Sequence, residues 1–186
     1  MPNYRRTFVP GGCWFFTVNL LDRRKKSLVD HVEVLRESVA LTRRQFPFTI
    51  DAFVVLPDHL HAIWSLPVHD SDFSVRWRLI KSRFARTLPK VELLSPVQRR
   101  RNERGIWQRR FWEHLIRDEA DFARHVEYCY FNPVKHGYVT RVSAWPHSSF
   151  HRDVGLGLFP QDWGGATESA GQFGEQSGAA RRITLR

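Results

Sequence analysis

The chain has few of the features that mark secreted or membrane proteins. It contains only two cysteines, Cys13 and Cys129, and no CxxC motif, which argues against a disulfide framework and a thiolate metal site. No apolar run approaches the ~18–20 residues of a membrane span, and the first residues, MPNYRRTF, do not resemble a signal peptide. We therefore expect a cytoplasmic protein in which Cys129 packs as a small apolar residue.

Acidic residues are scarce relative to basic ones. The sequence has 29 Lys and Arg against 19 Asp and Glu, which gives a formal net charge of +10 and a pI near 10.4. This excess favours a polyanionic partner, with nucleic acid as the first candidate. A membrane surface is less favoured because no long basic amphipathic helix is evident. Charge alone leaves open a basic protein without a polyanionic partner.

The hydrophobic pattern predicts strands and helices in a mixed order. Strands are predicted over residues 14–20, 48–56, 59–66 and, after a turn, within 107–116, and helices over 31–45, 71–88 and 118–131. Pro57 and Asp58 should turn the second and third strands into a hairpin, and residues 98–104 should form a loop. Asp118 is a suitable N-cap for the last helix, which should end at Asn132 because a residue before proline avoids the helical region.

This order predicts an α+β fold with a single ferredoxin-like unit. Its antiparallel sheet should carry helices on one face, and the last helix is appended to it. We assign residues 1–163 to this domain. The tail over 164–186 is rich in Gly, Ser and Ala and is predicted to be disordered.

Two histidines in the third predicted strand are candidate metal ligands. His59 and His61 are two residues apart, so both imidazoles should project from one face and Leu60 from the other. Two neutral imidazoles form half of a site for a divalent metal. The HxH spacing alone is weak evidence, because nearby histidines are more often ordinary polar strand residues.

The last predicted helix brings a tyrosine together with polar residues. At ~100° per residue, Asp121, His125, Tyr128 and Asn132 fall within one sector, whereas Tyr130 lies at the edge of an apolar stripe. The side-chain oxygen of Asn132 is a suitable ligand for a hard cation. An exposed polar helix face that happens to contain a tyrosine is the alternative, and His125 has an alternative as a surface histidine.

Several sequence blocks resemble those of the REP-associated tyrosine transposases, in the single-tyrosine branch of the HUH nucleases. The blocks are PDHLHAI, FWEHLIRDEADFARH, YCYFNPVKHG and WPHSSF, in the family's order over roughly residues 5–150. HLH fits the HUH pattern, and Tyr128 to Asn132 fits the YxxxN element. The sequence departs from the family at His147, where an aromatic residue is expected; this should affect packing more than chemistry.

The resemblance implies a transposase-type nuclease that acts on single-stranded DNA beside imperfect palindromic hairpins in the bacterial cytoplasm, at the nucleoid. Tyr128 is then the nucleophile and leaves a 5′-phosphotyrosine and a free 3′-hydroxyl. A divalent metal, Mg²⁺ or Mn²⁺, on His59, His61 and Asn132 would polarise the scissile phosphate, with His125 as a possible accessory group. A monomer is favoured over a dimer.

Basic residues in and beyond the second predicted helix are candidate phosphate contacts, and a tryptophan among them is a candidate for stacking on unpaired bases. These residues are Arg76, Lys81, Arg83, Arg99, Arg100, Arg101, Arg109, Arg110 and Trp107. Trp77 and Trp112 also lie among these charges, and core packing is the favoured alternative for all three tryptophans.

Two other functions compete with the transposase. One is a domesticated hairpin-binding protein without turnover, which the complete set of His59, His61, Tyr128 and Asn132 argues against. The other is a plasmid relaxase or replication initiator, which the short chain disfavours.

Overall fold

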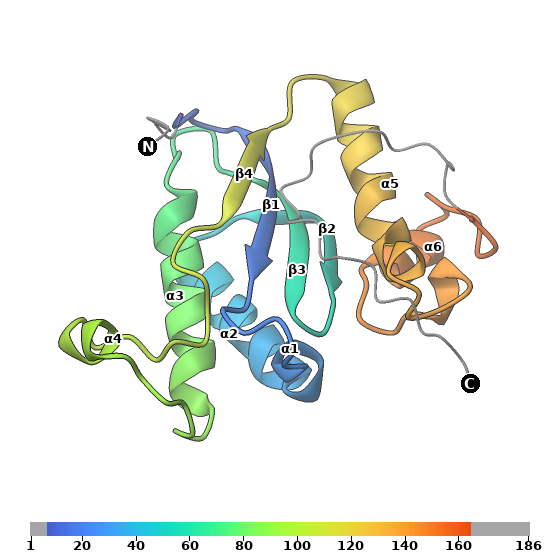
Figure 1. The fold of residues 1–186 in the computed structure, drawn as a ribbon. Coiled ribbons are helices and arrows are strands. Elements are labelled where there is room, and N and C mark those ends of the chain that lie inside the picture. The colour runs from blue at the N-terminus through green and yellow to red at the C-terminus, as the bar shows by residue number, and fades with distance from the viewer. Residues whose placement is uncertain (1–6, 165–186) are drawn as a thin grey trace, which may run out of the picture.

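A computed structural model describes residues 7–164 of the chain (Figure 1). Apart from residue 164, the tail predicted to be disordered lies outside the described residues. The helices and strands are β1 (Cys13–Asn19), α1 (Ser27–Asp30), α2 (Val32–Gln45), β2 (Thr49–Val55), β3 (His59–Ser65), α3 (Phe73–Thr87), α4 (Pro96–Arg100), β4 (Trp112–Leu115), α5 (Glu119–Lys135), the 3₁₀ helix η1 (Val142–Ala144) and α6 (Phe150–Gly155). None of the helices in the described part is long and apolar enough to cross a membrane.

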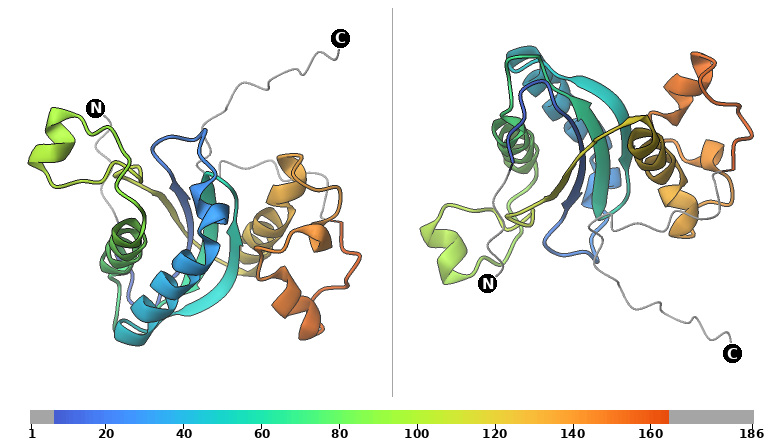
Figure 2. Two further views of the ribbon diagram at one scale, coloured as in Figure 1. Left: turned by 90° about the horizontal axis from the view of Figure 1, so that it is seen from below. Right: turned by 90° about the horizontal axis from the view of Figure 1, so that it is seen from above.

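The four strands form one antiparallel sheet in the order β2-β3-β1-β4. Together with the chain order, this arrangement is the predicted ferredoxin-like α+β fold. Helices α2 and α3 cover one face of the sheet, and α5 lies against the other (Figure 2). Both faces of the sheet are therefore covered, which explains why β3 is buried along nearly its whole length.

The β2-β3 hairpin places the histidine pair. Leu56 donates its N–H to the carbonyl of His59 at 2.9 Å across the predicted turn. Alternation along β3 sends Leu60 into the core beneath α2 and α3, whereas Ile63 joins the core on the α5 side. The His61 ring lies 5.2 Å from that of Tyr128 in the α5-side core and 5.0 Å from the His59 ring, so the two histidines face away from Leu60, as the alternation predicts.

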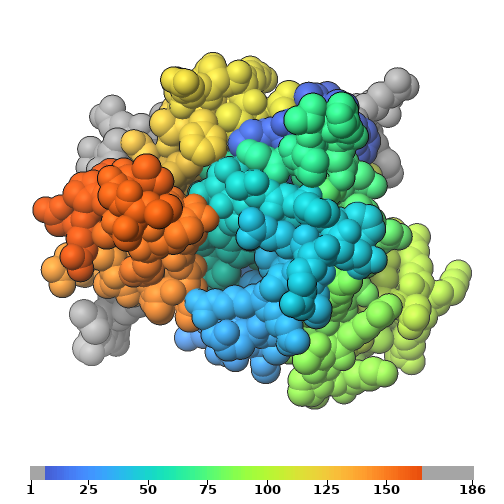
Figure 3. All heavy atoms as spheres, turned by 180° about the vertical axis from the view of Figure 1, so that it is seen from behind, coloured from blue at the N-terminus to red at the C-terminus, as the bar shows by residue number. Residues whose placement is uncertain are grey.

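The C-terminal segment covers the edge of strand β2. The carbonyl of His147 accepts a hydrogen bond from the N–H of Val55 at 2.9 Å, and the Ser149 N–H donates to the carbonyl of Phe53 at 2.8 Å. Arg152 adds bonds to the carbonyls of Ile50 and Asp51. The residues of this segment lie beside α2 and β2 in the space-filling view (Figure 3). This pairing protects an edge strand that would otherwise expose unpaired backbone groups.

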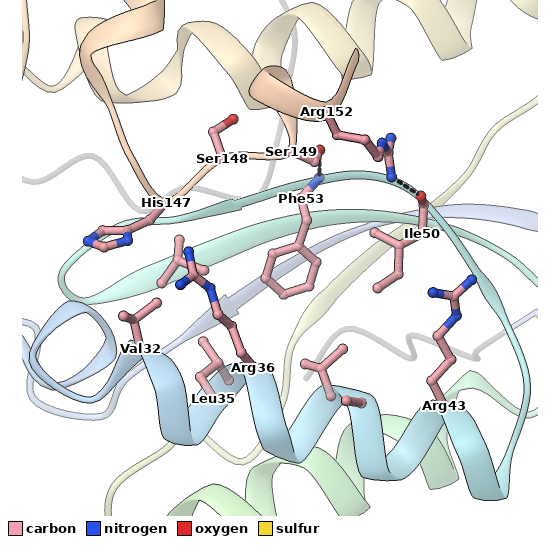
Figure 4. Close-up of a pocket in the computed structure, with 13 residues that line it drawn as sticks. Val32, Leu35, Arg36, Arg43, Ile50, Phe53, His147, Ser148, Ser149 and Arg152 are labelled. Carbon is pink, nitrogen blue, oxygen red and sulfur yellow. Dashed lines mark hydrogen bonds between the residues drawn. The ribbon is translucent and has the colours of Figure 1, made fainter. Parts of the chain in front are cut away.

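A cavity of about 390 Å³ lies between α2, β2 and this C-terminal segment (Figure 4). Its walls are mainly apolar and include Leu35, Val39 and Phe53, with Arg36 and His147 among its polar lining. None of the predicted catalytic or metal-ligating residues lines it. The unusual His147 therefore belongs to packing at the sheet edge.

Two expectations about helices were wrong. Part of the predicted loop over 98–104 belongs to α4, because Ser95 and Gln98 form a reciprocal capping box at its start. Helix α5 does not end at Asn132 but continues through Pro133 to Lys135. The residue after the C-cap is Gly137, whose φ of 71° suits the left-handed position of a Schellman motif.

Hydrogen bonds support this later helix end. Tyr138 donates its N–H to the carbonyl of Pro133 at 3.0 Å, and Gly137 donates to the carbonyl of Val134 at 2.9 Å. Pro133 removes one helical donor, yet Asn132 and Pro133 are both buried against the rest of the protein. Tertiary packing thus outweighs the local preference of the residue before proline.

Candidate active site

The β2-β3 hairpin and β1 hold the two histidines in defined orientations. His59 and His61 are 1% and 0% exposed, and their ring centroids are 5.0 Å apart. Thr17, opposite His61 in the β1-β3 register, places its hydroxyl 2.9 Å from Nδ1 of His61. Oδ1 of Asp58 lies 2.7 Å from Nδ1 of His59. With Nδ1 engaged in both rings, Nε2 is the nitrogen that each would offer to a metal.

Asp58 is an electrostatic partner of His59. Besides His59 it contacts Arg23, whose Nε lies 2.6 Å from Oδ2. Burial disfavours the carboxylate, but the hydrogen bonds and charges of His59 and Arg23 outweigh it, so the pKa of Asp58 lies below its usual value. An ionised Asp58 fixes the ring of His59 in the manner of the carboxylates behind metal-bound histidines.

Helix α5 carries Tyr128 to the same face of the sheet. The Tyr128 ring lies 5.2 Å from that of His61 and 6.0 Å from that of Phe15. Tyr128 is 4% exposed and Asn132 is 0% exposed, so the alternative of an exposed polar helix face is wrong. The arrangement brings together the predicted nucleophile and the predicted histidine ligands.

The neighbouring tyrosine has a different environment. Tyr130 is fully buried, packs against Phe150, and donates its hydroxyl hydrogen to Asp153. Burial, followed by this hydrogen bond, raises the pKa of Tyr130 well above its usual value. Tyr130 is thus a structural residue, as its position on the helix indicates.

Two residues of the site were not identified from the sequence: Lys135, which contacts Tyr128, and His136, which lies beside His59. Nζ of Lys135 lies 3.1 Å from the hydroxyl oxygen of Tyr128 and 4.6 Å from the centre of its ring. The ring of His136 lies 5.2 Å from that of His59. Both residues are in the YCYFNPVKHG block, but a helix ending at Asn132 gave no reason to place them beside the site.

His125 belongs to a network around Asp121 and is not a surface histidine. It is 5% exposed, and its Nδ1 lies 2.8 Å from the carbonyl oxygen of Asp121. His114 contacts the Asp121 carboxylate at 2.8 Å. Burial would raise the pKa of Asp121, but hydrogen bonds from His114 and the Arg117 N–H lower it to about 2.

Side chains in this network are also of types that ligate metals. His114, Asp121 and His125 place one ligand atom each within 4.8 Å of the others. The two imidazoles, however, are stacked at 4.6 Å with planes only 15° apart. A metal binds in the plane of an imidazole, so an ion could not lie in both planes. As arranged, the network joins β4 to α5 and so helps to position Tyr128.

The donor set at His59 and His61 fits a divalent cation better. Nε2 of His59 and Oδ1 of Asn132 are both buried side-chain atoms. Two imidazole nitrogens and one amide oxygen suit Mn²⁺ or Mg²⁺ more than structural zinc, which prefers a closed set of ligands, often with thiolates. The only two cysteines of the chain are not part of this set.

A basic groove of about 1270 Å³ begins near the histidine end of the sheet. Gln108 donates its N–H to the carbonyl of Asn19, the residue that pairs with His59 in the β1-β3 register. Most of its lining residues come from α3 and from residues 95–109, the segment that includes α4; Figure 1 shows where α3 and α4 lie. Its cationic lining residues are Arg78, Lys81, Arg86, Lys90, Arg101, Arg104 and Arg109.

Only some of the predicted phosphate contacts face solvent or this groove. Arg99, Arg100, Arg101, Arg109 and Arg110 are exposed. Lys81 lines the groove, with its Nζ 2.5 Å from the carbonyl oxygen of Gln108. Arg83 is directed toward α2, where it donates to Thr42 and Gln45.

Arg76 and Trp107 do not have the environments expected of DNA-binding residues. Arg76 is 0% exposed and binds Asp70 and the carbonyls of Asp72 and Pro47. A guanidinium held in this way cannot reach a phosphate. Trp107 is 9% exposed and packs against Phe84, so the core-packing alternative holds for it.

Comparisons with known proteins relate the chain to REP-associated tyrosine transposases. No family model matches the chain. It is 49% identical over 165 residues to the REP-associated tyrosine transposase of Escherichia coli K12, covering 89% of this chain and 92% of that protein. A Haemophilus influenzae protein provisionally given the same name is 48% identical over 166 residues, or 89% and 94% of the two chains. A solved structure of the REP-associated tyrosine transposase bound to a REP hairpin is 46% identical, covers 99% of this chain and all of that one, and has a TM-score of 0.77.

Proposed function

This chain belongs to the REP-associated tyrosine transposases, and we propose that it cuts and rejoins single-stranded DNA beside imperfect hairpins. The observation that carries the proposal is the buried Tyr128 ring 5.2 Å from the ring of His61. A similar solved protein was captured with a REP hairpin, which supports hairpin DNA as the partner.

The proposed reaction is a transesterification. The phenolic oxygen of Tyr128 loses its proton to solvent and forms a bond to the scissile phosphorus. The bond from phosphorus to the 3′ oxygen of the preceding nucleotide breaks, and that oxygen takes up a proton from solvent. The products are a 5′-phosphotyrosine and a free 3′-hydroxyl, so the bond can later be remade by the reverse step without an external energy source.

A divalent cation held by His59, His61 and Asn132 would supply charge neutralisation at the phosphate. The protein's own part is orientation. Asp58 and Thr17 engage Nδ1 of the two imidazoles. The packing of α5 against the sheet holds the Tyr128 side chain at the same face, which reduces the entropy lost on reaching the reactive geometry.

The basic groove provides a path for DNA to this site. It adjoins the end of β1 that pairs with His59, and Arg78, Arg101 and Arg109 on its lining are exposed. Arginines in such a groove bind phosphates without reading sequence. We assign the groove to the backbone of the hairpin-bearing strand.

Cleavage of hairpin oligonucleotides tests the proposal. Oligonucleotides taken from the DNA flanking the gene should be cut by the wild type and not by Tyr128→Phe, which removes the attacking oxygen and little else. Tyr130→Phe is the matched control, because Tyr130 is buried and bonded to Asp153, and this variant should still cleave. A covalent adduct on a nicked oligonucleotide should map to the peptide with Tyr128.

The possible results separate the alternatives. Cleavage by Tyr128→Phe but not by Tyr130→Phe would mean that the two tyrosines have been assigned the wrong roles. Cleavage by both variants would overturn the tyrosine mechanism in favour of a metal-activated water. Hairpin binding by the wild type without any cleavage would identify a binding protein instead of an enzyme.

The metal site is tested separately by calorimetric titration with Mn²⁺. The wild type should bind the ion, and a variant with both His59→Ala and His61→Ala should lose this binding. Equal binding by the two proteins would rule the site out.

A further inference from the structure

Helix α5 brings an ammonium group to the attacking oxygen. Nζ of Lys135 lies 3.1 Å from the Tyr128 hydroxyl and 4.6 Å from the centre of the ring. It therefore contacts the one atom of this chain that forms a bond in the proposed reaction. No role for Lys135 follows from the HUH pattern or from the YxxxN element.

The geometry has a simple origin in the helix. Residues 128 and 135 are seven apart, which is about two turns at 3.6 residues per turn. They therefore lie on the same face of α5, provided that the helix continues through Pro133. The Schellman motif at Gly137 ends the helix only after Lys135.

We propose that Lys135 is a catalytic residue that stabilises the phenolate of Tyr128 during strand cleavage; this inference rests on the proposed function. In the transesterification above, negative charge gathers on the phenolic oxygen as its proton leaves. An ammonium hydrogen-bonded to that oxygen stabilises the charge, and after transfer the same group lies beside the phosphotyrosine.

The neighbouring groups of the tyrosine make contacts of other kinds. His61 of β3 and Phe15 of β1 pack their rings against Tyr128. Asn132 of α5 is buried one turn away and is assigned to the metal. His125, one turn earlier, has Nδ1 2.8 Å from the carbonyl of Asp121. Lys135 brings its ammonium group to hydrogen-bond distance of the phenol oxygen.

The test separates the rate of chemistry from DNA binding. Lys135→Met removes the charge and keeps the stem. Its single-turnover cleavage rate at saturating hairpin oligonucleotide should fall about 10- to 100-fold, less than the ~10²–10³ of a fully enclosed oxyanion donor because Lys135 is exposed. Hairpin affinity should change by less than about threefold, since one exposed charge contributes little to a large interface, and Mn²⁺ binding should be unchanged.

Three further proteins exclude a structural explanation. Lys135→Arg, which keeps the charge, should recover most of the rate. Lys135→Ala should recover activity when ethylammonium is added, because the position is exposed. Lys26→Met removes one exposed lysine at the N-cap of α1 and should cleave like the wild type.

Each result bears on one claim. If the wild type cleaves and Lys135→Met cleaves at the same rate, the inference about Lys135 is wrong and the proposed function stands. It is also wrong if Lys135→Met loses Mn²⁺ binding together with activity and neither Arg nor ethylammonium restores the rate, because the defect is then structural. If the wild type does not cleave at all, the proposed function fails and this inference with it.

Discussion

Replacing Asp58 by Asn should weaken metal binding through a residue that is not itself a ligand. The Asp58 carboxylate lies 2.7 Å from Nδ1 of His59, and the substitution keeps its shape while removing its charge. Carboxylates in this position typically contribute about 10–100-fold to metal affinity. The Asp58 side chain is only 10% exposed, so solvent screens it little. Arg23, at 2.6 Å, neutralises part of its charge. We therefore expect a loss of about 10- to 30-fold in Mn²⁺ affinity, or ~1.4–2 kcal/mol.

Calorimetric titration of Mn²⁺ into the folded variants measures this effect. A substitution at Arg23, the other partner of Asp58, supplies a control that should not lower the Mn²⁺ affinity. Arg23→Gln frees the Asp58 carboxylate for His59 and removes a cation near the site, so its Mn²⁺ affinity should equal or exceed that of the wild type. Unchanged affinity in Asp58→Asn would refute the reasoning. A loss in Arg23→Gln as large as that in Asp58→Asn would also refute it, because both changes would then act by disturbing the local fold.

Three further predictions concern stability and DNA binding. The pKa of Asp121 is about 2 in the folded protein against an ordinary 3.8, so its ionised form stabilises the fold above about pH 4, and this stability is lost as the pH falls toward 2. Denaturant unfolding of Asp121→Asn should thus show a flatter dependence on pH in this range, and an identical slope would contradict the assignment. Arg76→Leu should lower the free energy of unfolding by about 2 kcal/mol, because it leaves the carbonyl oxygens of Asp72 and Pro47 unpaired, while Asp70, one-third exposed, can be hydrated; it should leave the salt dependence of DNA binding unchanged. Charge reversal at Arg100 and Arg101 should weaken binding and reduce the salt slope by roughly 0.7 for each phosphate of a single strand that is no longer neutralised; unchanged affinity and slope would place both residues outside the interface.

The parts of the site that depend on local periodicity could be predicted from the sequence. The side chains of a strand alternate, so the shared face of His59 and His61, opposite Leu60, follows from their spacing alone. The grouping of Tyr128 with Asn132, and its separation from Tyr130, likewise follow from the helical repeat. These inferences need no knowledge of what packs against the element.

The same periodicity would have corrected one wrong assignment. Arg76 lies three residues after Phe73 and four before Ile80, within the apolar stripe of α3. A count of basic residues along this helix treats all of them as one exposed group. Placing each on a helical face separates the buried Arg76 from Arg78 and Arg86, which line the groove.

Partners distant in the sequence could not be predicted in this way. Thr17 contacts His61 across 44 positions, and this pairing depends on the register of β1 against β3. The preceding Asp58 was visible in the sequence, but its role depends on the turn that directs its carboxylate to His59 and on the distant Arg23. Sequence patterns predict which face a residue occupies, whereas the register decides which residue it meets.

The end of helix α5 shows how a local rule can hide a residue that contacts Tyr128. The rule for residues before proline concerns the steric cost at Asn132 alone, and that cost is small enough for tertiary burial to offset. Had the helix ended there, Lys135 would lie on an irregular segment with no fixed relation to Tyr128. Because it continues to Lys135, the two side chains are brought within hydrogen-bonding distance. The sequence does carry a signal for the later end, since His-Gly at 136–137 suits a helix C-terminus better than Asn-Pro does. Weighing the glycine against the proline puts Lys135 on the same face as Tyr128 from the helical repeat alone.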